Sequence, residues 1–270
     1  LCYLLFVQSF AFSQTWQQLY DFPSSERDDG VSFVIGSKAY TGSGFDALGN
    51  VTGDFYSLDF HTDAWPPIAS LPAGNQRQYA VAFSNNSSGF VLGGVNASGQ
   101  VLNDLWMYDT LANVWTSKTP KPGAPLAAMS SFVFGDTAYV FCGNNNLGVS
   151  GNDQIWAYSM STDVWKIRDT IPFAGRWRAS TCIINNKGYL LFGRDTSGRF
   201  CKELYEFSPT TFSWQQLTDF PNNGRNYAAM YQFQNALYLF AGIDTLATCY
   251  NDVWKYDLSA NQWSSSTNLP

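Results

Sequence analysis

Four arginine residues recur at nearly constant intervals along the chain, each just before a predicted strand. They are Arg27, Arg77, Arg176 and Arg225, and the corresponding position of the remaining repeat holds Leu126. A guanidinium group binds a carboxylate through two parallel hydrogen bonds, so arginines that converge in space could hold an anionic ligand. The competing interpretation is structural: the same side chains could bind loop carbonyls or the acidic side chains of adjacent repeats.

One further arginine, Arg178, has no counterpart in the other repeats and directly follows Trp177. An indole ring can stack on the apolar face of a sugar, while a neighbouring guanidinium can bind a carboxylate. We therefore favour Trp177 and Arg178 over the four repeated arginines as the core of a sugar or carboxylate site.

An acidic residue also recurs once in each repeat. Recurrence favours a structural duty, such as accepting backbone N–H bonds at the end of a loop. The set comprises Asp54, Asp104, Asp153, Glu203 and Asp252. Glu203 is retained only as a weak candidate for an acid–base group.

The chain contains one histidine, His61, in a predicted tight turn. This count argues against a histidine-based metal site and against a Ser-His-Asp triad, so we expect neither a metal nor another cofactor. The formal net charge of −6 argues against a nucleic-acid partner and against an anionic membrane surface, because both favour a basic protein.

Five cysteines are present, and Cys2 lies in a segment that we expect to be removed. Cys201 and Cys249 occupy nearly matching places in adjacent repeats, so a disulfide between them is one interpretation and two free thiols are the other. Cys142 and Cys182 lie in predicted strands and are expected to be buried thiols.

The elements that position these residues follow a period of about 50 residues. Tryptophans mark the end of each repeat, spaced by 49 or 50 residues: Trp16, Trp65, Trp115, Trp165, Trp214 and Trp263. A second, strongly apolar strand of each repeat ends in glycine: Gly44, Gly94, Gly143, Gly193 and Gly242. A regular period over the whole chain predicts a repeat architecture.

Each repeat carries four short runs rich in aromatic and β-branched residues, which predict four antiparallel strands. The turns between the first and second strands and between the third and fourth strands are tight. The other two connections are long, so both sets of long loops should emerge on the same face of the molecule. Loops held by a rigid scaffold often carry the recognition residues of a protein.

The strand ending in glycine, together with an aromatic residue seven positions before the tryptophan, resembles the kelch repeat over roughly residues 15–270. The pairs Tyr108/Trp115 and Tyr158/Trp165 show the pattern, and Leu58 before Trp65 departs from it. The resemblance implies an all-β, kelch-type β-propeller spanning residues 14–270. It implies five complete four-stranded blades near residues 24–66, 73–116, 123–166, 173–215 and 222–264. A strand near residues 15–19 would close the last blade of what we interpret as part of a six-bladed ring.

Residues 1–13 are apolar and end in small residues, which is typical of the end of a secretory signal peptide. We therefore expect an exported protein of bacterial type that is secreted, periplasmic or on the cell surface. The run is too short to insert into a membrane as a spanning helix.

A propeller of this kind suggests a module that binds a protein or a glycan through its long-loop face, and we expect no catalysis. The alternative, implied by exported kelch proteins, is a mutarotase or epimerase of the sialic-acid type acting at the channel mouth. Arg176, Arg178 and Arg225 would then hold the substrate carboxylate. Copper chemistry of the galactose oxidase type, which shares the fold, is disfavoured because it needs two histidines. The ligand and the oligomeric state stay open.

Overall fold

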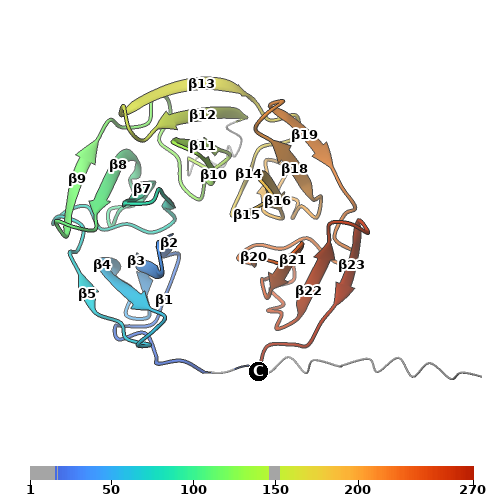
Figure 1. Cartoon of the computed structure of the whole chain (residues 1–270), viewed down its shortest axis with the longest axis horizontal. Helices are drawn as coiled ribbons and strands as arrows, with labels where there is room; N and C mark the ends of the chain where they lie inside the picture. The colour runs from blue at the N-terminus through green and yellow to red at the C-terminus, as the bar shows by residue number, and fades with distance from the viewer. Residues whose placement is uncertain (1–15, 17, 146–152) are drawn as a thin grey trace, which may run out of the picture.

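The computed structural model describes residues 16, 18–145 and 153–270, and these residues form strands but no helix. One five-stranded sheet and four four-stranded sheets are arranged around a central axis like the blades of a propeller, and a two-stranded ribbon accompanies one of them (Figure 1). The predicted all-β propeller with five four-stranded blades is therefore confirmed. The predicted leader at residues 1–13 lies outside the described residues. Among the described residues, no helix is long and apolar enough to cross a membrane.

Each blade is an antiparallel meander whose first strand lies nearest the axis and whose last strand lies at the rim (Figure 1). Blade 1 comprises β1 (Arg27–Asp28), β2 (Val31–Ile35), β3 (Lys38–Asp46), β4 (Val51–Asp59) and β5 (Pro67–Ile68). Blade 2 comprises β6 (Val81–Ser84), β7 (Ser88–Val95), β8 (Val101–Asp109) and β9 (Val114–Lys118). Blade 3 comprises β10 (Ser130–Phe134), β11 (Thr137–Phe141), β12 (Gln154–Ser159) and β13 (Val164–Thr170).

The last two blades follow the same order. Blade 4 comprises β15 (Ser180–Ile184), β16 (Lys187–Leu191), β18 (Tyr205–Ser208) and β19 (Ser213–Gln216), with a small ribbon of β14 (Arg176–Trp177) and β17 (Arg194–Asp195). Blade 5 comprises β20 (Ala229–Phe233), β21 (Ala236–Phe240), β22 (Val253–Asp257) and β23 (Gln262–Ser265).

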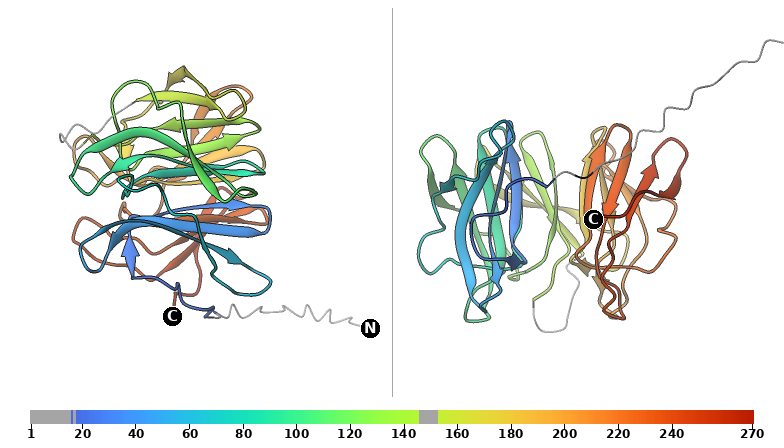
Figure 2. Two further views of the ribbon diagram at one scale, coloured as in Figure 1. Left: turned by 90° about the vertical axis from the view of Figure 1, so that its left-hand side faces the viewer. Right: turned by 90° about the horizontal axis from the view of Figure 1, so that it is seen from below.

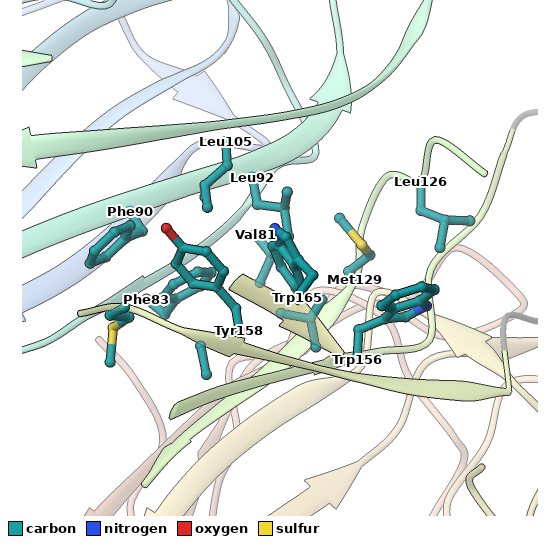
Figure 3. Packing of buried hydrophobic residues seen from close by; sticks show 13 residues of the cluster. Val81, Phe83, Phe90, Leu92, Leu105, Leu126, Met129, Trp156, Tyr158 and Trp165 are labelled. Atoms are coloured by element: carbon teal, nitrogen blue, oxygen red, sulfur yellow. The ribbon is translucent and has the colours of Figure 1, made fainter. Parts of the chain in front are cut away.

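The hydrophobic core lies between neighbouring blades rather than at the centre. Tyr158 of β12 packs against Phe83 and Phe90 of blade 2, and Trp156 and Trp165 belong to the same cluster (Figure 3). Three further clusters join blades 1 and 2, blades 3 and 4, and blades 4 and 5 in the same way. Aromatic side chains bury much apolar area each, so they contribute most to this packing.

A backbone bond links each of the first four blades to the blade that follows it. The N–H groups of Gly44, Gly94, Gly143 and Gly193 donate to the carbonyl of the arginine position in the next blade, over 2.8–3.1 Å. The turn needs glycine: the φ of Gly94 is +93°, and a Cβ there would lie 2.5 Å from the carbonyl oxygen of Gln78.

The repeated tryptophans supply a second link, in the opposite direction. The indole N–H of Trp65, Trp115, Trp165 or Trp263 donates to a loop carbonyl just before its own blade, over 2.7–3.1 Å. Trp214 is the exception, because its buried indole nitrogen has no partner in the described part of the chain. Trp16 likewise donates to the carbonyl of Asn268, which holds the first described residues beside the C-terminal end of blade 5 (Figure 2).

Candidate ligand site at the channel mouth

The repeated arginines are already bound to acidic side chains of their own blades. Arg77 is fully buried and donates to both carboxylate oxygens of Asp104 over 2.8 Å. Arg225 binds Asp252 in the same two-pronged way, over 2.6 and 2.7 Å. Each bond joins the segment just before the first strand to the beginning of the third strand of the same blade, or to the residue directly before it. The structural alternative drawn from the sequence names acidic side chains of adjacent repeats instead.

Arg27 and Arg176 follow the same rule with small differences. Arg27 donates to both oxygens of Asp54 over 2.5 and 3.0 Å. The guanidinium of Arg176 lies 3.8 Å from Glu203 and donates to the Phe192 carbonyl over 3.2 Å. The four guanidinium groups are thus separated, each inside its own blade, and do not converge on one ligand.

Electrostatics support a structural role for these pairs. Burial by itself raises the pKa of the Asp104 carboxyl, but the hydrogen bonds and charge of Arg77 outweigh burial and hold that pKa below its usual value. The same balance lowers the pKa of Asp252 beside Arg225. The carboxylates therefore stay ionised, and each arginine and its acid form an ion pair with two hydrogen bonds, which we call a clasp.

The third blade lacks both members of the pair. Leu126 replaces the arginine, and Gln154 replaces the acid, because Gln154 accepts the Trp156 indole N–H over 3.2 Å just as Asp104 accepts that of Trp106 over 2.7 Å. The sequence alignment had placed Asp153 at this position, which is wrong by one residue. Asp153 itself is exposed.

Lys121 lies between blades 2 and 3. The equivalent residues at two other blade junctions, Leu71 and Phe220, are buried and apolar. Only 1% of Lys121 is exposed, and its Nζ atom donates to the Pro122 carbonyl over 2.9 Å. The amine also lies 5.3 Å from the centre of the Trp156 ring. Burial lowers the pKa of this lysine to about 8.

Glu203 is not poised for proton transfer. Burial raises the pKa of Glu203. The hydrogen bond from Arg199 and the charges of Arg176 and Arg199 outweigh burial, so the pKa lies below its usual value. Arg199 donates to Glu203 over 2.5 Å, and the carboxylate is held in this ion pair. The structure therefore gives Glu203 a partner on its own loop rather than a place at the channel mouth.

A different circle of residues surrounds the channel mouth. Its members each lie two residues after the arginine position of a blade: Asp29, Tyr79, Ala128, Arg178 and Tyr227. Each has a backbone φ between +51° and +59°. Backbone bonds connect four of them, since the N–H groups of Tyr79, Ala128 and Arg178 donate to the carbonyl of the preceding member over 2.7–3.2 Å. Sequence reasoning found only Arg178, although the constant offset from the arginines was visible.

Aromatic rings surround the guanidinium of Arg178. Its centre lies 4.3 Å from the rings of Trp177 and Tyr227 and 4.6 Å from the ring of Tyr79. Its buried Nε atom has no hydrogen-bond acceptor in the described part of the chain. The predicted pairing of Trp177 with Arg178 is present, and two tyrosines from other blades complete it.

A carboxyl group with a raised pKa faces this arginine. The Tyr79 side chain lies between Asp29 and Tyr227 and influences the pKa of both groups. Burial is the largest influence and raises the pKa of Asp29, with a further increase from Asp28, against the bond from Tyr79 and the charge of Arg178. Burial and Asp29 also raise the pKa of Tyr79.

These four side chains border a cavity of about 290 Å³ whose walls are small residues of the innermost strands, such as Ala80, Ala179 and Ala228. β1 pairs with the end of β3, so this mouth lies on the same face as the connection between β3 and β4. A guanidinium with unused donors, aromatic walls and one carboxyl group can bind a ligand that carries both a carboxylate and a hydrogen-bond donor.

The remaining predicted groups do not form a second site. Cys201 is buried and Cys249 is exposed, and both are free thiols, so the disulfide considered from the sequence is not formed. His61 is exposed and lies 3.3 Å from Asp59. Within residues 16, 18–145 and 153–270, no cluster of three or more His, Cys, Asp or Glu side chains could hold a metal ion.

Comparison with known proteins places this geometry in a wider context. The profile of the KLHDC2/KLHL20/DRC7 Kelch-repeats domain matches residues 3–171 and 128–268. No curated protein sequence matches the chain significantly. Among solved structures, that of YjhT has a TM-score of 0.80 at 18% sequence identity, covering 93% of this chain and 86% of that chain. At this identity the likeness concerns the fold.

Proposed function

Because the chain belongs to the kelch-repeat family, we propose that it is a binding module whose long-loop face receives a protein or a glycan. The channel mouth on that face binds a carboxylate group of the partner, and Arg178 supplies the hydrogen bonds. We further propose that the protein is exported, on the basis of the apolar residues 1–13.

The observation that supports this function most is the state of Arg178. The four repeated arginines each bind an acid or a carbonyl, whereas Arg178 is held in place by three rings and its donors have no acceptor among the described residues. Ordering a long side chain before the ligand arrives lowers the entropic cost of binding. Acidic sugars and acidic peptide side chains share the carboxylate that such a group binds.

The test measures binding of N-acetylneuraminic acid, glucuronic acid and a glutamate-rich peptide by calorimetry. Arg178→Gln should weaken binding of the carboxylate ligand at least about tenfold, because a charged hydrogen bond contributes roughly 1.5–3 kcal/mol. Arg168→Gln is the matched control, since Arg168 is exposed on β13. Equal affinities of wild type and Arg178→Gln for every probe would reject the channel-mouth site.

A second function, opening and closing a sugar ring in the manner of a sialic-acid mutarotase, is favoured by one observation. Asp29 carries a raised pKa and faces Arg178 through Tyr79, as a group that gives and takes a proton near a bound carboxylate should. The assay follows the anomers of N-acetylneuraminic acid by NMR with wild type and Asp29→Asn. No acceleration by the wild-type protein would eliminate this second function and leave the binding module intact.

A further inference from the structure

Two opposite charges lie at the channel mouth and are held apart by a tyrosine. The carboxyl group of Asp29 is influenced by the charge of Arg178, but the two groups form no ion pair in the described part of the chain. Tyr79 lies between them, since it lowers the pKa of Asp29 and its ring is 4.6 Å from the Arg178 guanidinium centre. In the clasps, by contrast, the cation and the acid are in direct contact.

The position of the Arg178 guanidinium depends on a small residue beside it in the circle. Blade 3 contributes Ala128, which comes between Tyr79 and Arg178 in the circle and has no side chain beyond Cβ. The guanidinium therefore reaches from blade 4 to the Tyr79 ring of blade 2, while it also lies 4.3 Å from the Tyr227 ring of blade 5. This places the cation in the middle of the circle rather than within its own blade.

A second guanidinium without an acidic partner lies on the blade 4 side of the mouth. Arg194 is directly opposite Trp177 in the ribbon of β14 and β17, and the Trp177 ring is 4.3 Å from the Arg178 guanidinium centre. Arg194 is exposed, and its Nε atom donates to the Gly198 carbonyl over 3.2 Å. Arg194 forms no ion pair with any described residue, so the positive charge on this side is not neutralised.

The blade 1 side carries the opposite charge. Asp28 is exposed and raises the pKa of the adjacent Asp29, and neither carboxyl group has an ion-pair partner among the described residues. Glu26, two residues earlier, is exposed as well. The arginine of this blade, Arg27, is already bound to Asp54. The mouth is therefore negative at blade 1 and positive at blade 4.

We propose that the channel mouth binds a peptide that carries both a carboxylate and a cationic side chain, with the carboxylate on Arg178 and the cation on Asp29. This inference rests on the proposed function, and it names the partner as a peptide rather than a glycan. An acidic sugar supplies a carboxylate but no cation, so it would leave Asp29 without a counter-ion. The cavity of about 290 Å³ lies at the lower end of the range for ligand pockets, which suits a short segment.

A cation at Asp29 offsets the cost of burying this carboxyl group. Burial is the largest influence on Asp29 and raises its pKa, because a buried carboxylate loses the solvation that water supplies. An opposite charge in contact favours the ionised form. The face of the neighbouring Tyr79 ring also attracts a cation. An ammonium or guanidinium group is therefore favoured over a neutral donor on this side of the mouth.

The test measures binding of blocked peptides to the 270-residue protein by calorimetry. Each peptide has an N-terminal acetyl group, one glutamate, up to about three glycines as a spacer, one lysine and a C-terminal amide. Its analogue has glutamine in place of the lysine. At the spacing that fits, the lysine peptide should bind at least about fivefold more tightly than its analogue, because the lysine adds a charged hydrogen bond.

Two protein variants locate this preference. Asp29→Asn should abolish it, whereas Asp169→Asn, which changes an exposed carboxyl group on β13, should preserve it. The four combinations of wild type or Asp29→Asn with the two peptides form a double-mutant cycle, which separates the contact with Asp29 from any general loss of affinity. If Asp29→Asn fails to fold, Asp28→Asn serves as the second variant, and it should reduce the preference for lysine.

The outcomes also separate this inference from the proposed function. If glutamate peptides bind through Arg178 but lysine adds no affinity at any spacing, the inference is overturned and the proposed function stands. Tighter binding of N-acetylneuraminic acid than of every peptide, or a lysine preference that persists in both Asp28→Asn and Asp29→Asn, would overturn it as well. Unchanged affinities in Arg178→Gln would instead remove the proposed function, and this inference with it.

Discussion

Replacing Lys121 by leucine should stabilise this protein, although it removes a hydrogen bond. Burial lowers the pKa of Lys121 from 10.5 to about 8, so the folded state disfavours the charged amine that the unfolded chain carries. A difference of about 2.5 in pKa corresponds to about 3 kcal/mol at pH 7. Loss of the bond to the Pro122 carbonyl offsets about 1 kcal/mol of this gain. We therefore expect a net stabilisation of about 2 kcal/mol.

The pH dependence of this difference follows from the same pKa values. Below pH 8 both the folded and the unfolded states carry the proton, so the penalty on the wild type is constant and largest there. Between pH 8 and 10.5 the unfolded chain binds more protons than the folded protein, and the wild type recovers stability as pH rises. The electrostatic penalty should fall from about 3 to about 1 kcal/mol between pH 7 and 10.

Urea unfolding followed by tryptophan fluorescence at pH 6.5, 8 and 10 measures these differences directly. Lys166→Leu is the matched control, because Lys166 is exposed on β13 and its substitution should change stability by less than about 0.5 kcal/mol. A Lys121→Leu protein that is less stable than wild type at pH 6.5 would refute the reasoning. So would a difference that stays constant up to pH 10.

Three further outcomes follow from the geometry. Asp104→Asn should cost about 2–3 kcal/mol in urea unfolding because it leaves a fully buried arginine without its carboxylate, whereas Asp153→Asn should be neutral. The contribution of Asp104 should be lost as pH falls below 3.8, since its folded pKa is lowered. Gly94→Ala should cost more than about 2 kcal/mol in the same measurement, and Gly99→Ala, where a Cβ meets open space, about 1 kcal/mol. A thiol reagent read by mass spectrometry should label Cys249 in the native protein and spare the buried cysteines until unfolding.

The fold was predictable because each repeat contributes one copy of the same signals. Six tryptophans at a spacing of 49 or 50 residues define the period, and the glycines define where second strands end. The error at Asp153 shows the limit of matching letters: counting back 11 residues from each tryptophan gives Asp54, Asp104 and Asp252, but Gln154 in the third repeat. Asp153 was matched to the acidic residues of the other repeats because it directly precedes Gln154 and has the same carboxylate group.

The site was less predictable because the sequence does not say which arginines are already bound. A constant separation of 27 residues between arginine and acid marks the clasp, but only the structure shows that both lie in one blade. The sequence did not indicate Asp29, Tyr79 and Tyr227, because these residues differ in type. They share only their position two residues after the arginine position of each repeat. Their proximity depends on the curvature of the blades around the central axis, which brings residues about 150 positions apart to one mouth.

The main-chain bonds that join Tyr79, Ala128 and Arg178 to their preceding neighbours have a consequence for how this protein can change. Because the circle is held together by backbone atoms, its side chains are not needed for its shape. Ligand preference can therefore be rewritten at these positions while the scaffold stays constant. Descendants of one ancestral ring could diverge in what they recognise through a handful of substitutions, and exchanging this set between related proteins should transfer specificity.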